Sequence, residues 1–235
     1  MNWLRLGYVW YRVRRVAARR RWTYMPLLRV RRLRLHLAAR PDSAVCIEGF
    51  PRSGNTYAVA TFEQANPTAG HIARHLHAIG QIQQALRHRV PTVVLVRDPV
   101  DAVASLAVRG TQATLVDLFR DYTDLYGYVV GVKSRLGIVG FQELTADAGV
   151  VSDRLATHFG TDFARFEHSP ERDVAVVARI EQLDVEDPEG GEERTVARRS
   201  TARSTDRARY VAAIHQEVPR ATIDRARQLH RVLTS

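Results

Sequence analysis

The sequence predicts a three-layer α/β fold, with a central parallel sheet and helices on both of its faces. Short apolar runs of strand length alternate along the chain with longer stretches of helical periodicity, an alternation typical of parallel sheets. The runs lack the polar alternation of half-exposed strands, which indicates strands buried on both faces. A chain of 235 residues, 45% of them hydrophobic and 26% charged, is large enough for one such domain, and this composition excludes wholesale disorder.

The predicted strands and helices follow one another through residues 41–235, which we treat as a single domain. The run 92–96 is the most apolar and β-branched. Asp98 and Pro99 predict a helix start, because aspartate caps helices and proline suits their first position. The predicted strands cover 44–48, 92–96 and 138–141, the predicted helices cover 55–64, 76–88, 99–108, 114–136 and 150–159, and a last helix carries Ile223, Ala226, His230 and Leu233 on one face.

Residues 181–193 predict a turn or mobile loop. They include seven acids and no base, and Pro188-Glu189-Gly190-Gly191 lies at their centre. A solvated surface loop and a lid over a substrate are both consistent with this composition.

The net charge of +10 is concentrated in residues 1–40, which hold twelve arginines and no acid. The other 23 basic residues and all 25 acids lie in 41–235, which sums to about −2. Apolar and aromatic residues alternate with these arginines, and three interpretations stay open: an amphipathic helix on an anionic membrane surface, a basic helix packed on the domain, and an arm that binds nucleic acid. Pro26 is expected to end or kink the first helical piece.

Residues 1–40 (the arm) contain neither the pattern of a membrane span nor that of a secretory signal, since arginines interrupt every apolar stretch well before about 20 residues. The one cysteine, Cys46, cannot form an internal disulfide. Both observations favour a cytoplasmic protein. The first interpretation of the arm would place that protein peripherally on the inner face of a membrane.

A glycine-rich turn follows the first predicted strand. Residues 49–54 (the 49–54 loop) have the G-x-x-x-x-G spacing of a P-loop and lie between a strand and a helix. Such a loop turns backbone N–H groups and a helix N-terminus toward an anion. Asn55 occupies the position of the lysine in nucleoside triphosphatases, and Arg52 places a cation inside the loop. A Gly-Pro turn without a ligand is the alternative.

Two motifs together resemble a known family. Residues 51–57, Pro-Arg-Ser-Gly-Asn-Thr-Tyr, resemble the 5′-phosphosulfate loop of sulfotransferases that use 3′-phosphoadenosine 5′-phosphosulfate (PAPS). Residues 96–105, with Arg97 and Ser105 eight positions apart, are similar to that family's 3′-phosphate motif. His75, followed by a leucine, stands 22 residues before Arg97, where the family carries a His-Leu pair, and 139–144 weakly resembles its Tyr-Glu-Asp-Leu segment.

The resemblance covers about residues 44–160 and implies a P-loop-like nucleotide site with PAPS as sulfuryl donor. It implies His75 as general base for an acceptor hydroxyl and Arg52 as the cation that stabilises charge on the departing phosphate. No metal is expected, because the transferred sulfonate carries a single charge. Tyr57 is expected to stack on adenine or to be buried against the sheet. The implied nucleotide-binding residues are Arg52, Ser53, Gly54, Asn55, Thr56, Tyr57, Arg97, Ser105 and Phe141.

The chain departs from the family's pattern in three places. Asn55 replaces a hydroxyl-bearing residue, Phe141 replaces a tyrosine, and the Arg-Lys-Gly segment that closes over the 3′-phosphate is missing. Arg198 and Arg199 are the predicted nucleotide-binding substitutes for that segment, with a solvated basic run as the alternative.

Other functions stay open beside a sulfotransferase. One is a P-loop kinase or nucleoside triphosphatase, against which Asn55 in the lysine position speaks. Another is a non-catalytic protein that binds polyanions or membranes through a degenerate nucleotide fold. His71, His75 and His77 could bind zinc or form a plain surface cluster, but no cysteine or carboxylate nearby completes a metal site. The acceptor is expected to be a hydroxyl of a carbohydrate, a glycolipid or a small molecule, and the motifs do not decide among these.

Overall fold

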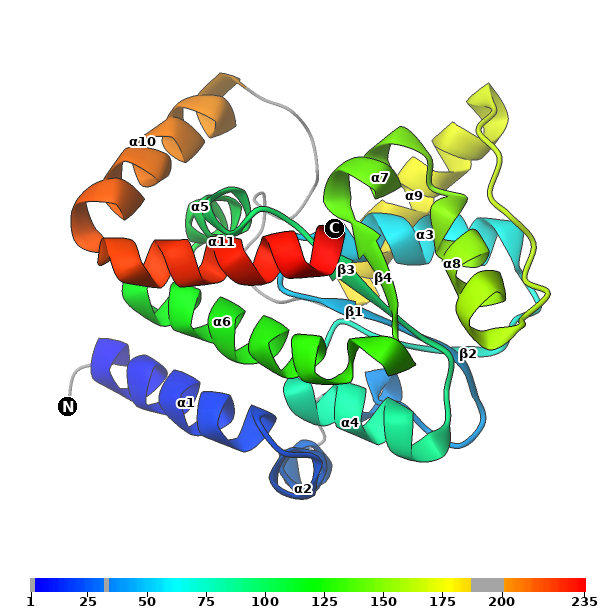
Figure 1. Cartoon of the computed structure of the whole chain (residues 1–235), viewed down its shortest axis with the longest axis horizontal. Coiled ribbons are helices and arrows are strands. Elements are labelled where there is room, and N and C mark those ends of the chain that lie inside the picture. The colour runs from blue at the N-terminus through cyan, green and yellow to red at the C-terminus, as the bar shows by residue number, and fades with distance from the viewer. Residues whose placement is uncertain (1–2, 32–33, 187–200) are drawn as a thin grey trace.

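The computed structural model describes residues 3–31, 34–186 and 201–235 (Figure 1). These residues confirm the predicted fold class, because they form a central sheet of four parallel strands with helices on both faces. The order of the strands reverses between β1 and β3, and sheets of this type bind ligands at such a reversal. The strands β1 (Ser43–Gly49), β2 (His71–Arg74), β3 (Thr92–Val96) and β4 (Gly137–Gly140) lie in the order β2-β1-β3-β4.

Alternate residues of β3 enter two different cores. Val93 and Leu95 pack with α3 (Asn55–Ala65), α8 (Val150–Phe159) and α9 (Pro170–Glu186) on one face of the sheet. Val94 and Val96 pack with α5 (Pro99–Arg109), α6 (Leu115–Val132) and α11 (Arg220–Thr234) on the other. The strand is therefore a continuous apolar run. The domain also contains α4 (Ile79–His88), α7 (Phe141–Ala146) and α10 (Thr201–Glu217), with short 3-10 turns at Leu35–Leu37 and Lys133–Arg135.

The predicted helix start after β3 is confirmed. The carboxylate of Asp98 accepts the backbone N–H groups of Val100 and Asp101 at 2.9 and 3.1 Å, and Pro99 occupies the first position of α5. Helix α6 ends at Val132 rather than at 136. The helices α5 and α6 connect β3 to β4. They pack on the sheet face that holds Val94 and Val96.

The segment before α4 differs from the prediction. Residues 71–74 form the edge strand β2, which the sequence did not indicate because a histidine and an arginine stand at its ends. α4 begins at Ile79 rather than at 76. The cause is Glu48, whose buried carboxylate accepts the backbone N–H groups of Leu76 (2.8 Å) and His77 (3.0 Å). These bonds hold the turn between β2 and α4 against the end of β1.

The prediction of a loop at 181–193 is wrong for residues 181–186, because α9 continues to Glu186. Val176, Ile180 and Leu183 repeat at helical spacing and pack toward the sheet. A buried apolar face therefore outweighs the acidic composition of this stretch. Residues 187–193 lie outside the described part of the chain, as do Arg198 and Arg199, so the predicted role of these arginines stays a prediction.

The arm forms two helices, α1 (Trp3–Ala18) and α2 (Arg21–Arg31). Pro26 neither ends the first helix nor separates the two, contrary to the prediction, since it lies inside α2. The chain leaves α1 at 19–20, where the hydroxyl of Thr23 donates to the carbonyls of Ala17 and Arg20 at 2.7 and 2.9 Å. Pro26 is the sixth residue of α2, so its missing N–H removes one backbone hydrogen bond of that helix.

α1 packs along α6 through polar contacts, and the two helices lie side by side (Figure 1). Asp117, Asp121 and Asp124 (the acidic stripe) share one face of α6 at helical spacing. Arg15 of α1 forms ion pairs with all three of these aspartates. The hydroxyl of Tyr8 donates to Asp117 at 3.1 Å. The seam between the two helices is therefore a partly buried network of opposite charges.

α2 is held instead by apolar contacts. Tyr24, Met25 and Leu28 are buried in a small core together with Leu37 and Leu76. The inner faces of both helices thus match the interpretation in which the arm packs on its own domain. None of the described helices combines the length and the apolarity that a bilayer crossing requires.

The acidic stripe predicts a specific dependence of stability on pH. Burial alone would raise the pKa of Asp117, but hydrogen bonds from Thr114 and Tyr8 and the charge of Arg15 outweigh it and lower that pKa. A carboxyl with a lowered folded-state pKa stabilises the fold above its unfolded pKa of about 3.9 and loses this contribution as the pH falls through the folded pKa. We expect the free energy of unfolding to fall more steeply below about pH 4 in the parent protein than in Asp117→Asn.

Urea denaturation at a series of pH values measures this difference. The exposed Asp162 supplies the control, since Asp162→Asn should keep the acid slope of the parent protein. An unchanged slope in Asp117→Asn would contradict the role given to its carboxylate.

Candidate functional site

The carboxyl ends of all four described strands meet at one edge of the sheet, and each leads into a predicted site residue. β1 leads into the 49–54 loop, β2 into His75, β3 into Arg97 and β4 into Phe141. The 49–54 loop and Phe141, which are remote in sequence, are thereby brought to the same edge of the sheet. The structure thus assembles the motifs that the sequence singled out.

The 49–54 loop has the backbone of an anion cradle. Arg52 (φ 69°) and Gly54 (φ 91°) both adopt left-handed conformations, and alternation of this kind turns successive N–H groups into one concavity. α3 begins at Asn55, so the N–H groups of its first turn have no partner within the helix. Glycine is required at both ends of the loop, since a Cβ on Gly49 would lie 2.5 Å from the carbonyl oxygen of Leu95, and one on Gly54 would lie 2.8 Å from Leu144.

Four predicted residues are in mutual contact beside this loop. The Nε of Arg52 donates to the hydroxyl of Ser105 at 3.1 Å. An Nη of Arg97 donates to the carbonyl oxygen of Arg52 at 2.8 Å. The guanidinium of Arg97 also lies over the ring of Phe141, 4.1 Å from its centroid, an arrangement that positions the cation without neutralising it.

Arg97 is a half-buried cation without an ion-paired carboxylate in the described part of the chain. Burial lowers the pKa of Arg97, and the neighbouring charge of Arg207 lowers it further, whereas Asp101 and Asp98 act in the opposite direction. The carboxylate of Asp98 is engaged in capping α5. The Nε of Arg97 is buried and has no hydrogen-bond partner among the described residues. A buried N–H of a cation that has no partner is costly unless an acceptor joins it, so this geometry suits an anionic ligand.

Arg207 of α10 is a residue of this site that sequence reasoning missed. It forms an ion pair with Asp101 of α5, and its charge acts on Arg97. The sequence search for a closing basic segment selected Arg198 and Arg199, which precede α10. Which arginine of α10 faces α5 is decided by how the two helices pack, and no local pattern in the sequence reports that contact.

Ser53 and Asn55, which are predicted to bind the nucleotide, use their side chains to hold the loop. The hydroxyl of Ser53 is buried at 3.4 Å from the hydroxyl of Tyr126. The amide of Asn55 donates to the carbonyl of Phe50 at 3.0 Å across the loop. The backbone N–H of Ser53 also stays within the loop, since it donates to the carbonyl of Phe50 at 3.2 Å, whereas the N–H of Asn55 belongs to the first turn of α3.

The two other predicted residues of α3 lie in its first turn, and both are half-buried. Thr56 follows Asn55 directly. Tyr57 packs partly against the core of the sheet, and burial raises the pKa of its hydroxyl. Tyr57 thus contacts the core while part of its ring stays exposed, and its stacking on adenine stays a prediction.

Two tyrosines of α6 fix this edge of the sheet, and the sequence did not single them out. The hydroxyl of Tyr126 donates to the carbonyl of Leu95 at 2.6 Å and accepts the N–H of Phe50 at 3.1 Å. The hydroxyl of Tyr122 donates to the carbonyl of Arg97 at 2.7 Å. Burial raises the pKa of Tyr126 to about 12 and also raises the pKa of Tyr122. Both hydroxyls therefore stay protonated and act as donors near neutral pH.

The three histidines near β2 lie in different surroundings. The ring nitrogens of His71 contact the hydroxyl of Ser43 and the carbonyl of His36 at 2.8 and 2.7 Å. His75, the predicted base, is 7% exposed, and its ring centroid lies 6.0 Å from that of His77. The Nδ1 of His77 lies 2.7 Å from the carbonyl oxygen of Gly49 at the start of the loop. Among the residues that the structure describes, no group of three or more side chains has the arrangement of a metal site.

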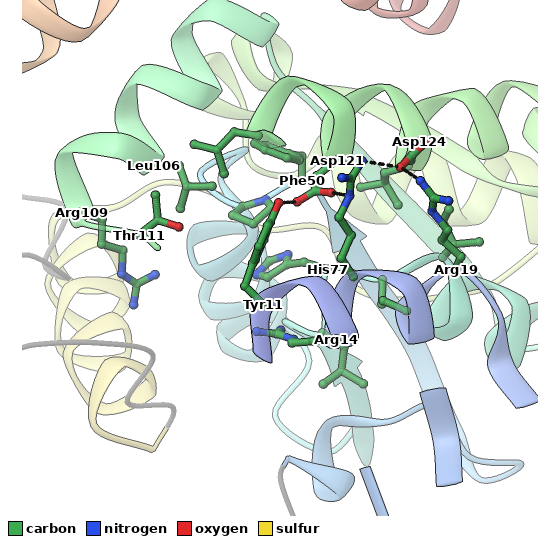
Figure 2. A pocket seen from close by; sticks show the side chains of 18 of the residues that line it. Tyr11, Arg14, Arg19, Phe50, His77, Leu106, Arg109, Thr111, Asp121 and Asp124 are labelled. Atoms are coloured by element: carbon green, nitrogen blue, oxygen red, sulfur yellow. Dashed lines mark hydrogen bonds and ion pairs between the residues drawn. The ribbon is translucent and has the colours of Figure 1, made fainter. Parts of the chain in front are cut away.

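A pocket of about 360 Å³ lies between α1 and the domain, beside the 49–54 loop (Figure 2). Phe50, Pro51 and His77 line the end next to the loop. α5, α6 and the connection between them supply Leu106, Arg109, Thr111, Leu118, Asp121, Asp124 and Leu125, and α1 supplies Tyr11, Arg14, Arg15, Ala18 and Arg19. The volume is within the range of small-molecule sites.

Comparisons with known proteins give no family assignment for this site. No protein-family model matches the chain, and no curated protein matches it. The features of this chain that bear on its function are the contacts among Arg52, Arg97 and Ser105 and the pocket between α1 and the domain.

The role of Tyr126 leads to a prediction about stability. Tyr126→Phe is expected to lower the free energy of unfolding by about 1–3 kcal/mol, because it leaves buried backbone groups of Leu95 and Phe50 without a partner. Urea denaturation followed by circular dichroism measures the change. Tyr210→Phe, at a half-buried position of α10, is the matched control and should change stability by less than about 0.5 kcal/mol. Equal losses in the two variants would exclude the anchoring role.

Proposed function

We propose that this chain is a sulfotransferase that moves the sulfuryl group of PAPS to the hydroxyl of an acceptor. The observation that carries the proposal is the contact between the two predicted anion receptors. Arg52 of the 49–54 loop bonds to Ser105, and Arg97 bonds to the backbone of Arg52. PAPS carries anionic groups at both ends of an adenosine, so it needs two receptors that face one crevice.

The residues present fit such a ligand. The loop N–H groups would hold the 5′-phosphosulfate, because they and the start of α3 form the cradle. Arg97 and Ser105 would hold the 3′-phosphate, since a guanidinium offers a bidentate fork and a hydroxyl adds a neutral donor. Arg207 would add a second positive charge on that side. An anion here would also provide the hydrogen-bond partner that the buried Nε of Arg97 lacks among the described residues.

The chemistry assigned to the protein is positioning and electrostatic stabilisation. PAPS supplies an activated sulfuryl group. Arg52 would stabilise negative charge on the departing phosphate without donating a proton, since an arginine stays protonated near neutral pH. A histidine of the 75–77 segment would accept the proton of the acceptor hydroxyl. His75 is the histidine that the resemblance favours.

The loop is less suited to ATP hydrolysis or kinase chemistry. The side chain of Asn55, in the lysine position of triphosphatases, is an uncharged amide that donates to the carbonyl of Phe50 within the loop, so no cation reaches a γ-phosphate from this position. This contact favours the sulfotransferase over the kinase alternative.

Nucleotide binding provides the first test. We expect adenosine 3′,5′-bisphosphate to bind more tightly than ATP with Mg²⁺ in calorimetry. Arg97→Gln is expected to weaken bisphosphate binding by about 10–100-fold, since hydrogen bonds to charged groups contribute about 1.5–3 kcal/mol. Arg207→Gln should weaken it in the same direction. Arg220→Gln is the control, because the side chain of Arg220 is 95% exposed.

Transfer of label provides the second test. The full chain is incubated with ³⁵S-labelled PAPS and with extracted lipids and polysaccharides, and label should appear in a product and be lost in Arg97→Gln. Preferred binding of ATP with Mg²⁺ would overturn the proposal in favour of a kinase or triphosphatase. Bisphosphate binding without transfer to any fraction would favour a non-catalytic nucleotide-binding protein.

We also propose that the enzyme is cytoplasmic and associates peripherally with anionic membranes through the outer face of the arm. Val9, Val13 and Val16 of α1 are 57%, 48% and 64% exposed and share one face of the helix. Trp22 is 60% exposed, and its ring is flanked by the guanidinium of Arg21 at 5.8 Å. Apolar and aromatic side chains among arginines are the composition of helices that lie in a lipid interface. A single cysteine fits a reducing compartment.

Vesicle binding tests this association. The full chain should co-sediment with vesicles that contain phosphatidylglycerol and less with pure phosphatidylcholine. Val13→Asp combined with Val16→Asp should reduce the bound fraction at least several-fold. The control is Val174→Asp with Val177→Asp, because these exposed valines have the same spacing on α9. Equal binding by both double variants, or a preference for single-stranded nucleic acid over vesicles, would contradict the membrane role.

A further inference from the structure

We propose that the pocket between α1 and the domain (the α1 pocket) is the acceptor site, and that it takes an apolar hydroxyl compound with an anionic group, with His77 as the base. This inference rests on the proposed function for its chemistry. The pocket itself, its charge and its histidine are observations independent of that function. Neither the resemblance nor the motifs indicated this site.

The α1 pocket is lined by residues next to the candidate nucleotide site. Phe50 and Pro51 line it, and the next residue is Arg52. On α5, Leu106 and Arg109 also line the pocket, and they follow Ser105 by one residue and by one helical turn. Arg52 bonds to Ser105, so a ligand in the pocket lies beside the loop that would hold the transferred group.

The inner wall of the α1 pocket is apolar. Leu118 and Leu125 of α6 and Leu76 before α4 are buried, and Ile79 and Leu106 complete the wall. Leucine side chains cannot replace the hydrogen bonds of sugar hydroxyls with water, and burying such hydroxyls without partners is costly. An apolar body suits this wall better than a carbohydrate does.

The charge that remains at the α1 pocket is positive. Its acids are engaged, since Asp121 binds Tyr11 and Arg15 and Asp124 binds Arg15 and Arg19. Figure 2 shows these contacts on one side of the pocket, with Arg109 and Thr111 on the other. Arg109 has no ion pair with any residue that the structure describes, and its Nε is buried without a hydrogen-bond partner. An anionic group on the ligand would meet this cation.

His77 rather than His75 faces this ligand, because the pocket is lined by His77. A carbonyl oxygen only accepts hydrogen bonds, so the 2.7 Å contact with Gly49 places a proton on Nδ1 of His77 and leaves Nε2 as the nitrogen that can accept one. Glu48, 3.7 Å from Nδ1, would stabilise the resulting imidazolium. The Gly49 carbonyl thus fixes the tautomer that a base needs.

The step is balanced with PAPS as the donor. The acceptor oxygen forms a bond to sulfur while the bond from sulfur to the 5′-phosphate oxygen breaks. The acceptor proton passes to Nε2 of His77. The products are a sulfate ester and adenosine 3′,5′-bisphosphate.

Ligand binding without any donor tests the pocket by itself. Two matched probes are 10-hydroxydecanoate and the uncharged 1,10-decanediol, measured by calorimetry on the full chain. We expect Arg109→Gln to weaken binding of the acid about tenfold, which corresponds to about 1.4 kcal/mol, and to leave the diol unchanged. Leu106→Asn should weaken both probes. Arg220→Gln should change neither, because its side chain is solvent-exposed. Absence of binding, or equal affinity of the acid for the parent and Arg109→Gln, overturns the pocket assignment.

Turnover with ³⁵S-labelled PAPS and 10-hydroxydecanoate tests the base. His77→Asn keeps an amide donor for the Gly49 carbonyl, and asparagine tolerates the φ of 51° at this position. The matched variant is His75→Asn, where φ is 55°. We expect His77→Asn to lower kcat at least a hundredfold while KM for the acid changes less than threefold, and His75→Asn to retain most of kcat. The opposite ranking would overturn the assignment of His77.

The two levels of inference fail differently. If label from PAPS enters an extracted lipid or polysaccharide but neither probe binds, the sulfotransferase stands and the α1 pocket is not its acceptor site. If the acid binds through Arg109 and bisphosphate binding is absent, the pocket is supported as a binding site and both the sulfotransferase and the base are overturned.

Discussion

The hydroxyl groups of Tyr122 and Tyr126 on α6 are the contacts on which the geometry of the site depends. They hold the carbonyls of Arg97 and Leu95 at the end of β3, and Tyr126 also binds the N–H of Phe50. One helix therefore sets the position of the 49–54 loop relative to Arg97. The same helix presents Asp117, Asp121 and Asp124 to α1 from another face. The loop and the wall of the neighbouring pocket are thus fixed by a single element, which ties the candidate nucleotide site to the candidate acceptor site.

The two arm helices are attached by different forces. α2 buries Tyr24, Met25 and Leu28 in an apolar core, and its attachment should depend little on salt. α1 is attached through Arg15 and the acidic stripe, a network of charges that water reaches in part. Screening by salt weakens such pairs. The pocket wall formed by α1 is therefore the part of the site that solution conditions can move, whereas the floor formed by the sheet and α6 is fixed by packing.

The sequence was sufficient for the parts of the fold and site that are determined locally. β3 was predicted from its apolar run, and α5 from the cap at Asp98, because both signals lie within a few residues. Arg52, Arg97, Ser105 and Phe141 were found through motifs, and the parallel order of the strands brings them together. By contrast, Arg207 and Tyr126 act across contacts between segments remote in sequence. Whether a given arginine or tyrosine of a helix reaches the site depends on the packing angle of that helix, and the sequence pattern does not encode it.

Backbone strain points to the same site without any motif. Five described residues other than glycine have a left-handed φ: Arg34, Arg52, His75, His77 and Arg89. Arg89 ends α4, where this conformation is common, whereas Arg52, His75 and His77 follow the carboxyl ends of β1 and β2. Each such residue costs about 1–3 kcal/mol and persists only where neighbouring contacts impose it.

The contacts that impose the left-handed φ of Arg52, His75 and His77 can be identified. Glu48 accepts the consecutive N–H groups of Leu76 and His77 within the turn between β2 and α4, and Arg97 binds the carbonyl of Arg52. Glu48 is 1% exposed, and a buried carboxylate is itself costly unless hydrogen bonds satisfy it. The fold thus places a buried charge and three strained residues at the carboxyl ends of β1 and β2. Such a concentration of unfavourable terms does not help the chain fold, and strained residues of this kind gather at functional sites.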